Sequence, residues 1–168
     1  MIKVDSYGNE EWSQNFSGLG GGYGNISVHQ TFDNGYIFSW KGFNPSDIWL
    51  IKTDSQGNQE WIQSIGGSSY DNIANSVQQT TDDGYIVAGS TSSFGNGSND
   101  VWLIKTDGEG NEVWDRTFGG SGYDYAYSVQ QTSDGGYIVT GYTSSFGNGA
   151  NDFWIIKTNS DGYTIPIE

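Results

Sequence analysis

Three aspartates recur at equivalent places in the chain, each directly before a short apolar segment that carries a tryptophan. They are Asp47, Asp100 and Asp152. Carboxylate oxygens are hard ligands, and Ca²⁺ takes about six to eight such oxygens. The spacing does not match a dedicated calcium loop. An Asx turn, in which the carboxylate accepts backbone N–H groups, places the same residue at a strand start. We therefore expect no cofactor and keep these three aspartates as the calcium candidates.

A second group of residues combines aromatic rings with amides and carboxylates in glycine-rich segments. Such rings stack on sugar rings or on partner side chains, and amides both donate and accept hydrogen bonds. The competing interpretation is that the rings fill the spaces between neighbouring structural units. The candidate ligand-binding residues are Tyr70, Asp71, Phe94, Asn96, Tyr123, Asp124, Phe146 and Asn148.

Catalytic chemistry has few residues to draw on. The chain has no cysteine and one histidine, His29, which excludes thiolate nucleophiles and multi-histidine metal sites. Glycine runs such as 119–122 precede a strand and not the helix N-terminus that would hold a phosphate. We predict that the protein is not an enzyme and has no catalytic residues. The alternative is a polysaccharide-acting enzyme with a site in a central channel, because His29 is the one strong departure from an internal repeat.

Length and charge narrow the classes of partner. The 168 residues predict one domain, residues 1–168. Twenty acidic side chains against six basic ones give a formal charge of −14, which repels phosphate backbones and anionic lipid. We therefore expect no nucleic-acid partner and no membrane insertion. The first residues lack the apolar core of a signal peptide, and the longest apolar runs are strand-sized.

An internal repeat organises these candidate groups. The segment Ile51-Lys52-Thr53-Asp54 recurs at 104–107 and 156–159, with a degenerate copy at 2–5, so that the spacings are 49, 53 and 52 residues. Two further segments recur in step with it, Ser76-Val77-Gln78-Gln79-Thr80 and Gly84-Tyr85-Ile86-Val87. The repeat units are 2–50, 51–103 and 104–155, followed by a partial fourth unit at 156–168.

Each unit predicts four β-strands and no helix, because β-branched and aromatic residues fall in short runs between Gly, Asn, Asp and Ser. In the second unit these strands are 74–80, 85–91, 101–106 and 112–118. Tight Asp/Asn–Gly turns alternate with longer loops, which places the long loops at one end of the units. The strand tryptophans, among them Trp61 and Trp114, predict packing between units. The repeated lysines each have an acidic or amide residue two positions on, which predicts a structural ion pair or a solvated ammonium group and not an amine catalyst.

On these residues the chain resembles the tandem β-propeller repeat family, with blades of about 50 residues, of bacterial and archaeal surface or secreted proteins. The segment 119–162, GGSGYDYAYSVQQTSDGGYIVTGYTSSFGNGANDFWIIKTNSDG, carries the resemblance most strongly. The resemblance implies an all-β fold, a β-propeller of four-stranded antiparallel blades with about three repeats per chain, and often an extracellular or cell-surface setting. It implies no particular reaction, because the family is defined by its blade. A β-trefoil or a β-prism, each also built from three four-stranded units, is the alternative fold.

The strands expected near the two ends of the chain predict self-association. Segments 2–4 and 11–16 match the third and fourth strands of a unit, whereas residues 163–166 lack the tryptophan of a fourth strand and include a proline. Propellers close with about four to eight blades. We therefore expect a homodimer that closes a six-bladed ring, with residues 11–16 of one chain completing the last blade of the other.

These expectations favour a binding protein. We predict a non-catalytic binding or scaffold module that displays repeated aromatic, Asn, Asp and Gly loops to a carbohydrate or protein ligand. Beside the polysaccharide-acting enzyme, the remaining alternative is a purely structural repeat.

Overall fold

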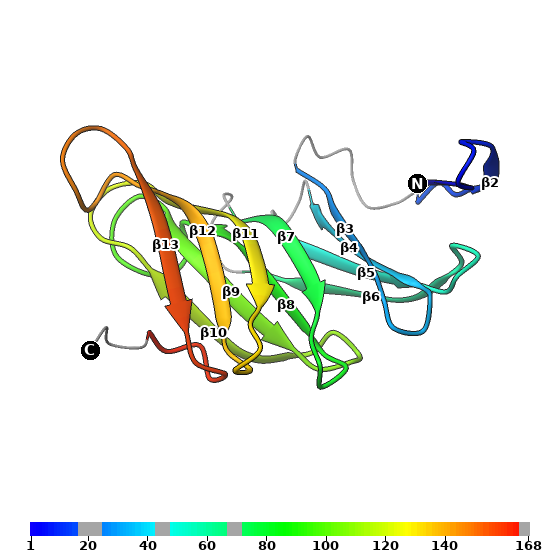
Figure 1. The fold of residues 1–168 in the computed structure, drawn as a ribbon. Helices are drawn as coiled ribbons and strands as arrows, with labels where there is room; N and C mark the ends of the chain where they lie inside the picture. The colour runs from blue at the N-terminus through cyan, green and yellow to red at the C-terminus, as the bar shows by residue number, and fades with distance from the viewer. Residues whose placement is uncertain (17–24, 43–47, 67–71, 165–168) are drawn as a thin grey trace.

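The computed structural model describes residues 1–16, 25–42, 48–66 and 72–164. Within these ranges the chain forms thirteen β-strands and no helix (Figure 1), which confirms the all-β prediction. The strands are β1 (Ile2–Val4), β2 (Glu10–Ser13), β3 (Ser27–Gln30), β4 (Tyr36–Lys41), β5 (Ile48–Thr53), β6 (Gln59–Ile65), β7 (Ile73–Gln79), β8 (Tyr85–Thr91), β9 (Asp100–Thr106), β10 (Glu112–Phe118), β11 (Asp124–Gln131), β12 (Tyr137–Thr143) and β13 (Asp152–Thr158). None of the described segments contains a helix long and apolar enough to cross a membrane.

The strands pair with their neighbours in the chain and form four antiparallel sheets. We call β3–β6 sheet 1, β7–β10 sheet 2, β11–β13 sheet 3, and β1–β2 the N-terminal hairpin. The four strands predicted for the second unit match β7 to β10 to within one residue at each end. The strand predicted at 11–16 is the shorter β2. Among the described residues sheet 3 has three strands, and Thr164 adds a single bridge to Thr158.

Side chains within the tight turns explain why these turns recur. In the β9–β10 turn the Asp107 carboxylate accepts the backbone N–H groups of Glu109 and Asn111 at 3.0 and 2.8 Å, and Asn111 Nδ2 donates to it at 2.9 Å. Gly110 follows with a φ of +80°, which L side chains rarely adopt. The same bonds recur around Asp5 and Asp54, so the D-x-x-G-N pattern encodes the turn.

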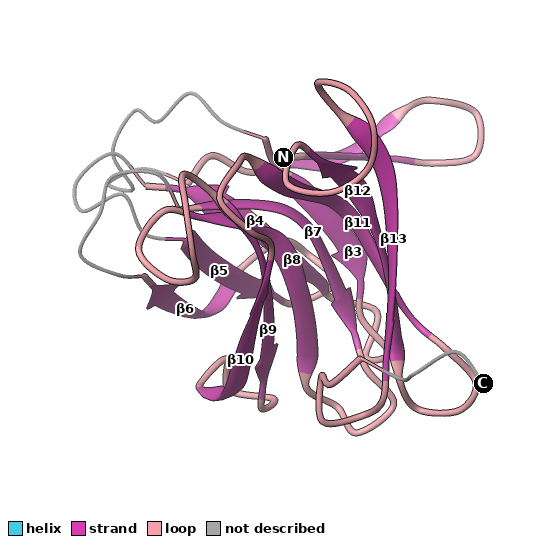
Figure 2. Cartoon of the chain, turned by 90° about the vertical axis from the view of Figure 1, so that its left-hand side faces the viewer, coloured by secondary structure: helices cyan, strands magenta, loops and turns pink. Residues whose placement is uncertain are grey.

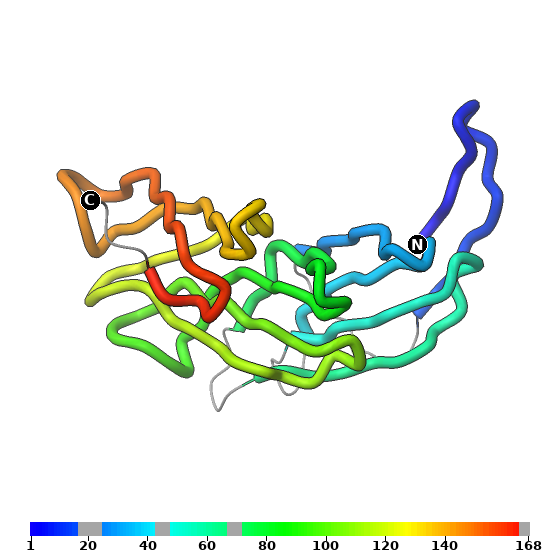
Figure 3. Tube along the Cα trace, turned by 60° about the horizontal axis from the view of Figure 1, so that its bottom comes forward, coloured from blue at the N-terminus to red at the C-terminus, as the bar shows by residue number. Residues whose placement is uncertain are grey.

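Successive sheets pack face to face. Ile37, Ile48 and Leu50 of sheet 1 belong to one buried apolar cluster with residues of sheet 2, and Ile86, Val101 and Leu103 of sheet 2 belong to a second cluster with residues of sheet 3. Figure 3 shows the hairpin and the three sheets following one another in chain order, and Figure 2 shows the loops that join their strands at the ends of the sheets. Burial of these faces is the main stabilising contribution available to the fold.

The first strands of the sheets, β3, β7 and β11, lie side by side, and each leaves one edge unpaired within its own sheet. Side chains from the neighbouring first strand meet the backbone N–H groups on that edge. Ser27 Oγ accepts the N–H of Val77 at 3.1 Å, and Ser76 Oγ accepts that of Val129 at 3.2 Å. The recurrence of serine before valine in S-V-Q-Q-T therefore reflects the need to satisfy an exposed strand edge.

A tryptophan joins each sheet to the next. Trp61 of β6 packs edge-on against Tyr85 of sheet 2, with ring centroids 5.7 Å apart, and Trp114 packs in the same way against Tyr137 at 5.8 Å. Trp12 of the hairpin contacts Tyr36 at 5.7 Å. The hairpin therefore lies against sheet 1 as β5–β6 lies against sheet 2, and the predicted packing role of these tryptophans is confirmed.

Candidate functional site

The two ends of the sheets differ in kind. Tight turns, such as those between β7 and β8 and between β9 and β10, lie at one end. The other end carries the longer connections 92–99, 119–123 and 144–151. The predicted alternation of tight turns and long loops is therefore confirmed within the described residues.

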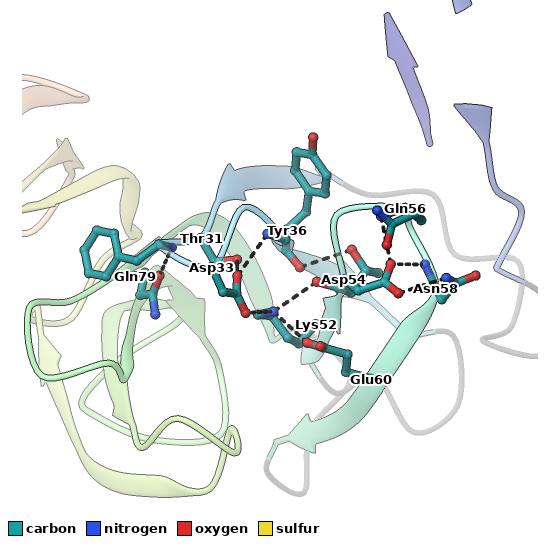
Figure 4. Close-up of polar contacts among 12 residues, drawn as sticks. Thr31, Asp33, Tyr36, Lys52, Asp54, Gln56, Asn58, Glu60 and Gln79 are labelled. Carbon is teal, nitrogen blue, oxygen red and sulfur yellow. Dashed lines mark hydrogen bonds and ion pairs between the residues drawn. The ribbon is translucent and has the colours of Figure 1, made fainter. Parts of the chain in front are cut away.

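The tight-turn end holds buried lysines in fixed ion pairs (Figure 4). Lys52 Nζ donates to Asp33 Oδ2 at 2.8 Å, to Glu60 Oε2 at 2.6 Å and to the Thr53 carbonyl at 3.0 Å. Lys105 and Lys157 pair in the same way with Asp82 and Asp134. The predicted ion pairs are present, but the carboxylates come from the turn between the first two strands of each sheet, and for Lys52 also from β6, not from two positions along the lysine's own strand. The carboxylate of Asp54, at that predicted position, is engaged by its own turn.

Hydrogen bonds keep both members of the Lys52–Asp33 pair charged. Burial alone would lower the pKa of Lys52, but its bonds to Asp33 and Glu60 outweigh that effect and raise it. For Asp33 the signs are reversed. Partial burial would raise its pKa, but hydrogen bonds from Lys52 and Thr31 outweigh that effect and lower the pKa to about 2. The Lys52 amine therefore stays charged and bonded, which suits a structural role.

At the opposite end, backbone hydrogen bonds hold the long loops to one another. The N–H of Ser98 donates to the Gly122 carbonyl at 3.2 Å, and the N–H of Asp124 donates to the Asn99 carbonyl at 2.8 Å. On the other side of this segment, the Tyr123 carbonyl accepts the N–H of Ser144 at 2.9 Å, and the backbone N–H of Tyr123 donates to Ser144 Oγ at 2.6 Å. The segment 119–123 is thus fixed between loops 92–99 and 144–151, so this end presents a preorganised surface.

Aromatic side chains remain exposed on these loops. Phe94 is 43% exposed, Phe146 51% and Tyr123 53%. The ring of Phe94 packs against Trp102 with centroids 5.4 Å apart, and Phe146 packs against Trp154 at 5.5 Å. Each phenyl ring is therefore held by a strand tryptophan and still accessible. Each phenylalanine thus packs on a tryptophan of its own unit, and stacking of these rings on a ligand stays a prediction.

The structure brings five of the eight candidate ligand-binding residues to this end. Phe94, Asn96, Tyr123, Phe146 and Asn148 are all exposed there. The candidates Tyr70 and Asp71, and the calcium candidate Asp47, lie outside the described residues. We call the five exposed residues the loop-end surface.

Asp124 lies beneath that surface. It is fully buried, and its carboxylate accepts hydrogen bonds from the Thr143 hydroxyl, from Ser145 Oγ at 2.6 Å and from the N–H of Gly120 at 3.0 Å. These bonds orient the loops without presenting Asp124 to a ligand.

In the preceding unit, Asn72 occupies the place of Asp124, since it accepts a bond from the Thr91 hydroxyl at 2.6 Å. The Tyr–Asp pairs at 70–71 and 123–124 make Asp71 the apparent counterpart of Asp124, but the two units differ in length by one residue there. Counting back four residues from Ser76 and from Ser128 would have identified Asn72 and Asp124 as equivalent.

Asp100 is a buried carboxylate with one unsatisfied oxygen. It is 2% exposed, and its Oδ2 accepts the N–H of Asn96 at 2.6 Å, as expected for a turn residue. Its Oδ1 has no hydrogen-bond partner within the described residues. Burial raises the pKa of Asp100, and the charge of Asp124 raises it further.

The calcium candidates are therefore dissimilar in their surroundings, because Asp152 is only half-buried. No group of three or more His, Cys, Asp or Glu side chains placed to hold a metal ion occurs among residues 1–16, 25–42, 48–66 and 72–164.

His29 lies on β3 in a groove of about 360 Å³ between the first strands of the sheets. Hydroxyls and amides line this groove, among them Ser76, Gln78 and Gln130. Nδ1 of His29 is buried and makes no hydrogen bond in the described part of the chain. The groove offers polar contacts for a small ligand, but less exposed aromatic surface than the loop end.

No protein-family model and no curated protein matches this sequence.

Proposed function

We propose that the protein is a non-catalytic binding module of the β-propeller type, which presents the loop-end surface to a carbohydrate. The observation that carries the proposal is the group of exposed aromatic rings, Phe94, Tyr123 and Phe146, on loops that are locked together by backbone hydrogen bonds. Function in a repeat scaffold usually resides on such loops.

The way the sheets stack supports the propeller. Each sheet packs face to face on the next in chain order, the first strands lie side by side, and a tryptophan links every consecutive pair. These are the relations expected between successive blades around a central channel. A β-trefoil or β-prism does not require them.

The chemistry of the loop-end surface favours a neutral sugar. Phenyl and phenol rings offer flat apolar surface, while Asn96 and Asn148 offer amide donors and acceptors beside them. A sugar presents both an apolar ring face and hydroxyl groups. The formal charge of −14 repels acidic glycans. Equivalent loops from successive units would add several weak contacts into useful avidity.

The test is a glycan array probed with the chain and with the triple variant Phe94→Ala, Tyr123→Ala, Phe146→Ala. We expect binding to neutral glycans that the triple variant loses while its circular dichroism stays unchanged. The matched control is Tyr7→Ala, which removes a 90% exposed ring from a turn at the opposite end and should bind normally. Binding that survives in the triple variant would show that this surface is the wrong one. Binding only to proteins would favour the protein-ligand alternative, and turnover of a polysaccharide pool would favour the enzyme.

A further inference from the structure

We propose that the outer face of sheet 3 binds the hairpin-side face of sheet 1 in a second copy of the chain, so that two copies close one ring of six sheets. This inference rests on the proposed propeller arrangement. It adds the partner and the atoms through which that partner is recognised.

The apolar faces support this pairing. Val101 and Leu103 of β9 are 1% and 0% exposed because sheet 3 covers them, whereas the equivalent residues of β13, Phe153 and Ile155, are 73% and 56% exposed. Such apolar surface on a sheet face favours association.

The complementary face is open on sheet 1. Val77 and Val129, on the first strands of sheets 2 and 3, are 3% and 5% exposed, whereas the equivalent Val28 of sheet 1 is 56% exposed. The chain thus has an uncovered copy of each half of its own internal sheet-to-sheet contact.

A groove marks where the second copy would dock. The N-terminal hairpin and the residues that follow it cover part of sheet 1, where Phe16 packs edge-on against Phe38 at 4.8 Å between ring centroids. It leaves an apolar groove of about 350 Å³ lined by Phe16, Ile26, Val28, Phe38 and Trp40. Ile26 is 56% exposed at its rim. The first two strands of an incoming sheet 3 would fill this groove as those of sheet 1 cover sheet 2.

Hydrogen bonds give the contact its register. Inside the chain, Ser76 Oγ accepts the N–H of Val129 at 3.2 Å, and Gln78 Oε1 accepts the N–H of Gln131 at 3.0 Å. The equivalent acceptors of sheet 3, Ser128 and Gln130, are exposed and have no such neighbour among the described residues. We expect them to accept the N–H groups of Val28 and Gln30, respectively, in the second copy.

A bond in the reverse direction completes the pattern. Gln79 Oε1 accepts the N–H of Phe32 at 2.7 Å, and Gln131 Oε1 accepts that of Thr81 at 2.9 Å. By the same relation Gln30, which is exposed, would accept the N–H of Ser133 in the second copy. A heterologous contact of this kind forms a ring when its rotation closes.

Docking requires β2 to exchange its partner strand. The hairpin already occupies the place of third and fourth strands beside sheet 1, so an incoming sheet 3 brings β13 to where β1 lies. β13 is held in sheet 3 by pairing with β12 along seven residues. β1 is only three residues long, and its Ile2 and Val4 are 65% and 51% exposed. β1 is therefore the strand that leaves.

After this exchange Lys157 would meet Glu11 of the second copy as Lys52 meets Glu60. Twelve of the thirteen strands described for each copy would then form three four-stranded sheets, and two copies would form six. That number lies within the range of about four to eight blades in which propellers close.

The test is the molar mass in solution by light scattering. We expect twice 18.3 kDa for the chain and a folded monomer for the double variant Phe153→Asp, Ile155→Asp, whose altered side chains are exposed in the single chain. Val113→Asp is the matched control, because Val113 is 60% exposed on β10 and lies outside the proposed contact. A mass of 18.3 kDa for the chain, or a double variant that stays dimeric, would overturn the inference.

Truncations test the strand exchange separately. Removal of residues 1–5 should leave the dimer intact, whereas removal of residues 1–16 should produce monomers or aggregates. Loss of the dimer on the shorter truncation would contradict the exchange. Phe94→Ala, Tyr123→Ala, Phe146→Ala should keep the dimeric mass, so that failure of glycan binding and failure of association can be told apart.

Discussion

The indole of Trp61 lies over Gly110, so close that a Cβ on that glycine would stand 2.7 Å from the ring. Trp12 bears the same relation to Gly57, and Trp114 to Gly162. The glycine in each of these turns therefore also leaves the space in which a tryptophan of the preceding sheet or hairpin packs. One glycine per unit fixes both the turn and the placing of neighbouring sheets.

Replacing Gly110 by alanine should destabilise the protein more than the backbone conformation alone explains. In Gly110→Ala the new Cβ would clash with Trp61, and the backbone φ would be +80°. In Gly8→Ala the φ would be +86°, but the new Cβ would have no atom within 4 Å. We expect Gly8→Ala to cost about 1 kcal/mol, from the backbone strain. Gly110→Ala should cost about 2–4 kcal/mol in urea unfolding, because overpacking adds to that strain. Equal costs for the two variants would show that the contact with Trp61 has no energetic weight.

The ion pair between Lys52 and Asp33 should make the free energy of unfolding depend on pH in the acidic range. The pKa of Asp33 is lowered from 3.8 to about 2 in the folded protein, so its contribution is present above the unfolded value and is lost as pH falls through the folded one. Urea midpoints measured between about pH 5 and pH 2 should therefore fall, and fall less steeply in Asp33→Asn. An unchanged acid slope in that variant would contradict the assignment.

Asp100 should behave in the opposite sense. Burial and the nearby charge of Asp124 raise its pKa, so its contribution to stability is present below the unfolded value of 3.8 and is lost as pH rises through the folded value. Asp100→Asn should raise the melting temperature at pH 7 by an amount worth on the order of 1 kcal/mol, because a neutral amide replaces a buried carboxylate near the charge of Asp124. The gain should shrink as pH falls from neutral toward 3.8, because the Asp100 carboxyl group then becomes protonated in the folded protein. The half-buried Asp152→Asn is the control, and a destabilised Asp100→Asn would argue for a bound cation instead.

Calcium should have little effect on stability. A ligand that binds only the native state stabilises it with the logarithm of its concentration over Kd. We expect the same melting temperature in chelator and in millimolar calcium. A shift of several degrees, lost in Asp100→Ala, would turn that carboxylate from a turn residue into a metal ligand.

Local patterns predicted the strands well, because each strand is a run of β-branched and aromatic residues bounded by turn chemistry. The prediction of the lysines' partners was wrong for a physical reason. Same-face spacing along one strand pointed to Asp54, whereas the hairpin geometry brings Asp33 from another turn to Lys52. The burial of Asp124 also escaped prediction, since a carboxylate in a loop gives no sign of the hydroxyls that fold over it.

Relations between sheets could be predicted only in part. The repeat of S-V-Q-Q-T was visible in the sequence, but its reason is the unpaired edge of a neighbouring strand, which no single unit reveals. Likewise, the open faces around Val28 and Phe153 become apparent only when their exposure is set against the buried equivalents in sheet 2.

The most direct test of how the sheets assemble is a cysteine cross-link between copies, which the absence of native cysteine makes clean. The control pair Ser76→Cys, Val129→Cys should close within one chain, because Ser76 Oγ lies 3.2 Å from the Val129 nitrogen. The test pair Val28→Cys, Ser128→Cys should close between two chains and give a covalent dimer of twice 18.3 kDa on a non-reducing gel. A test pair that stays monomeric, while the control pair forms its disulfide, would contradict the two-copy ring.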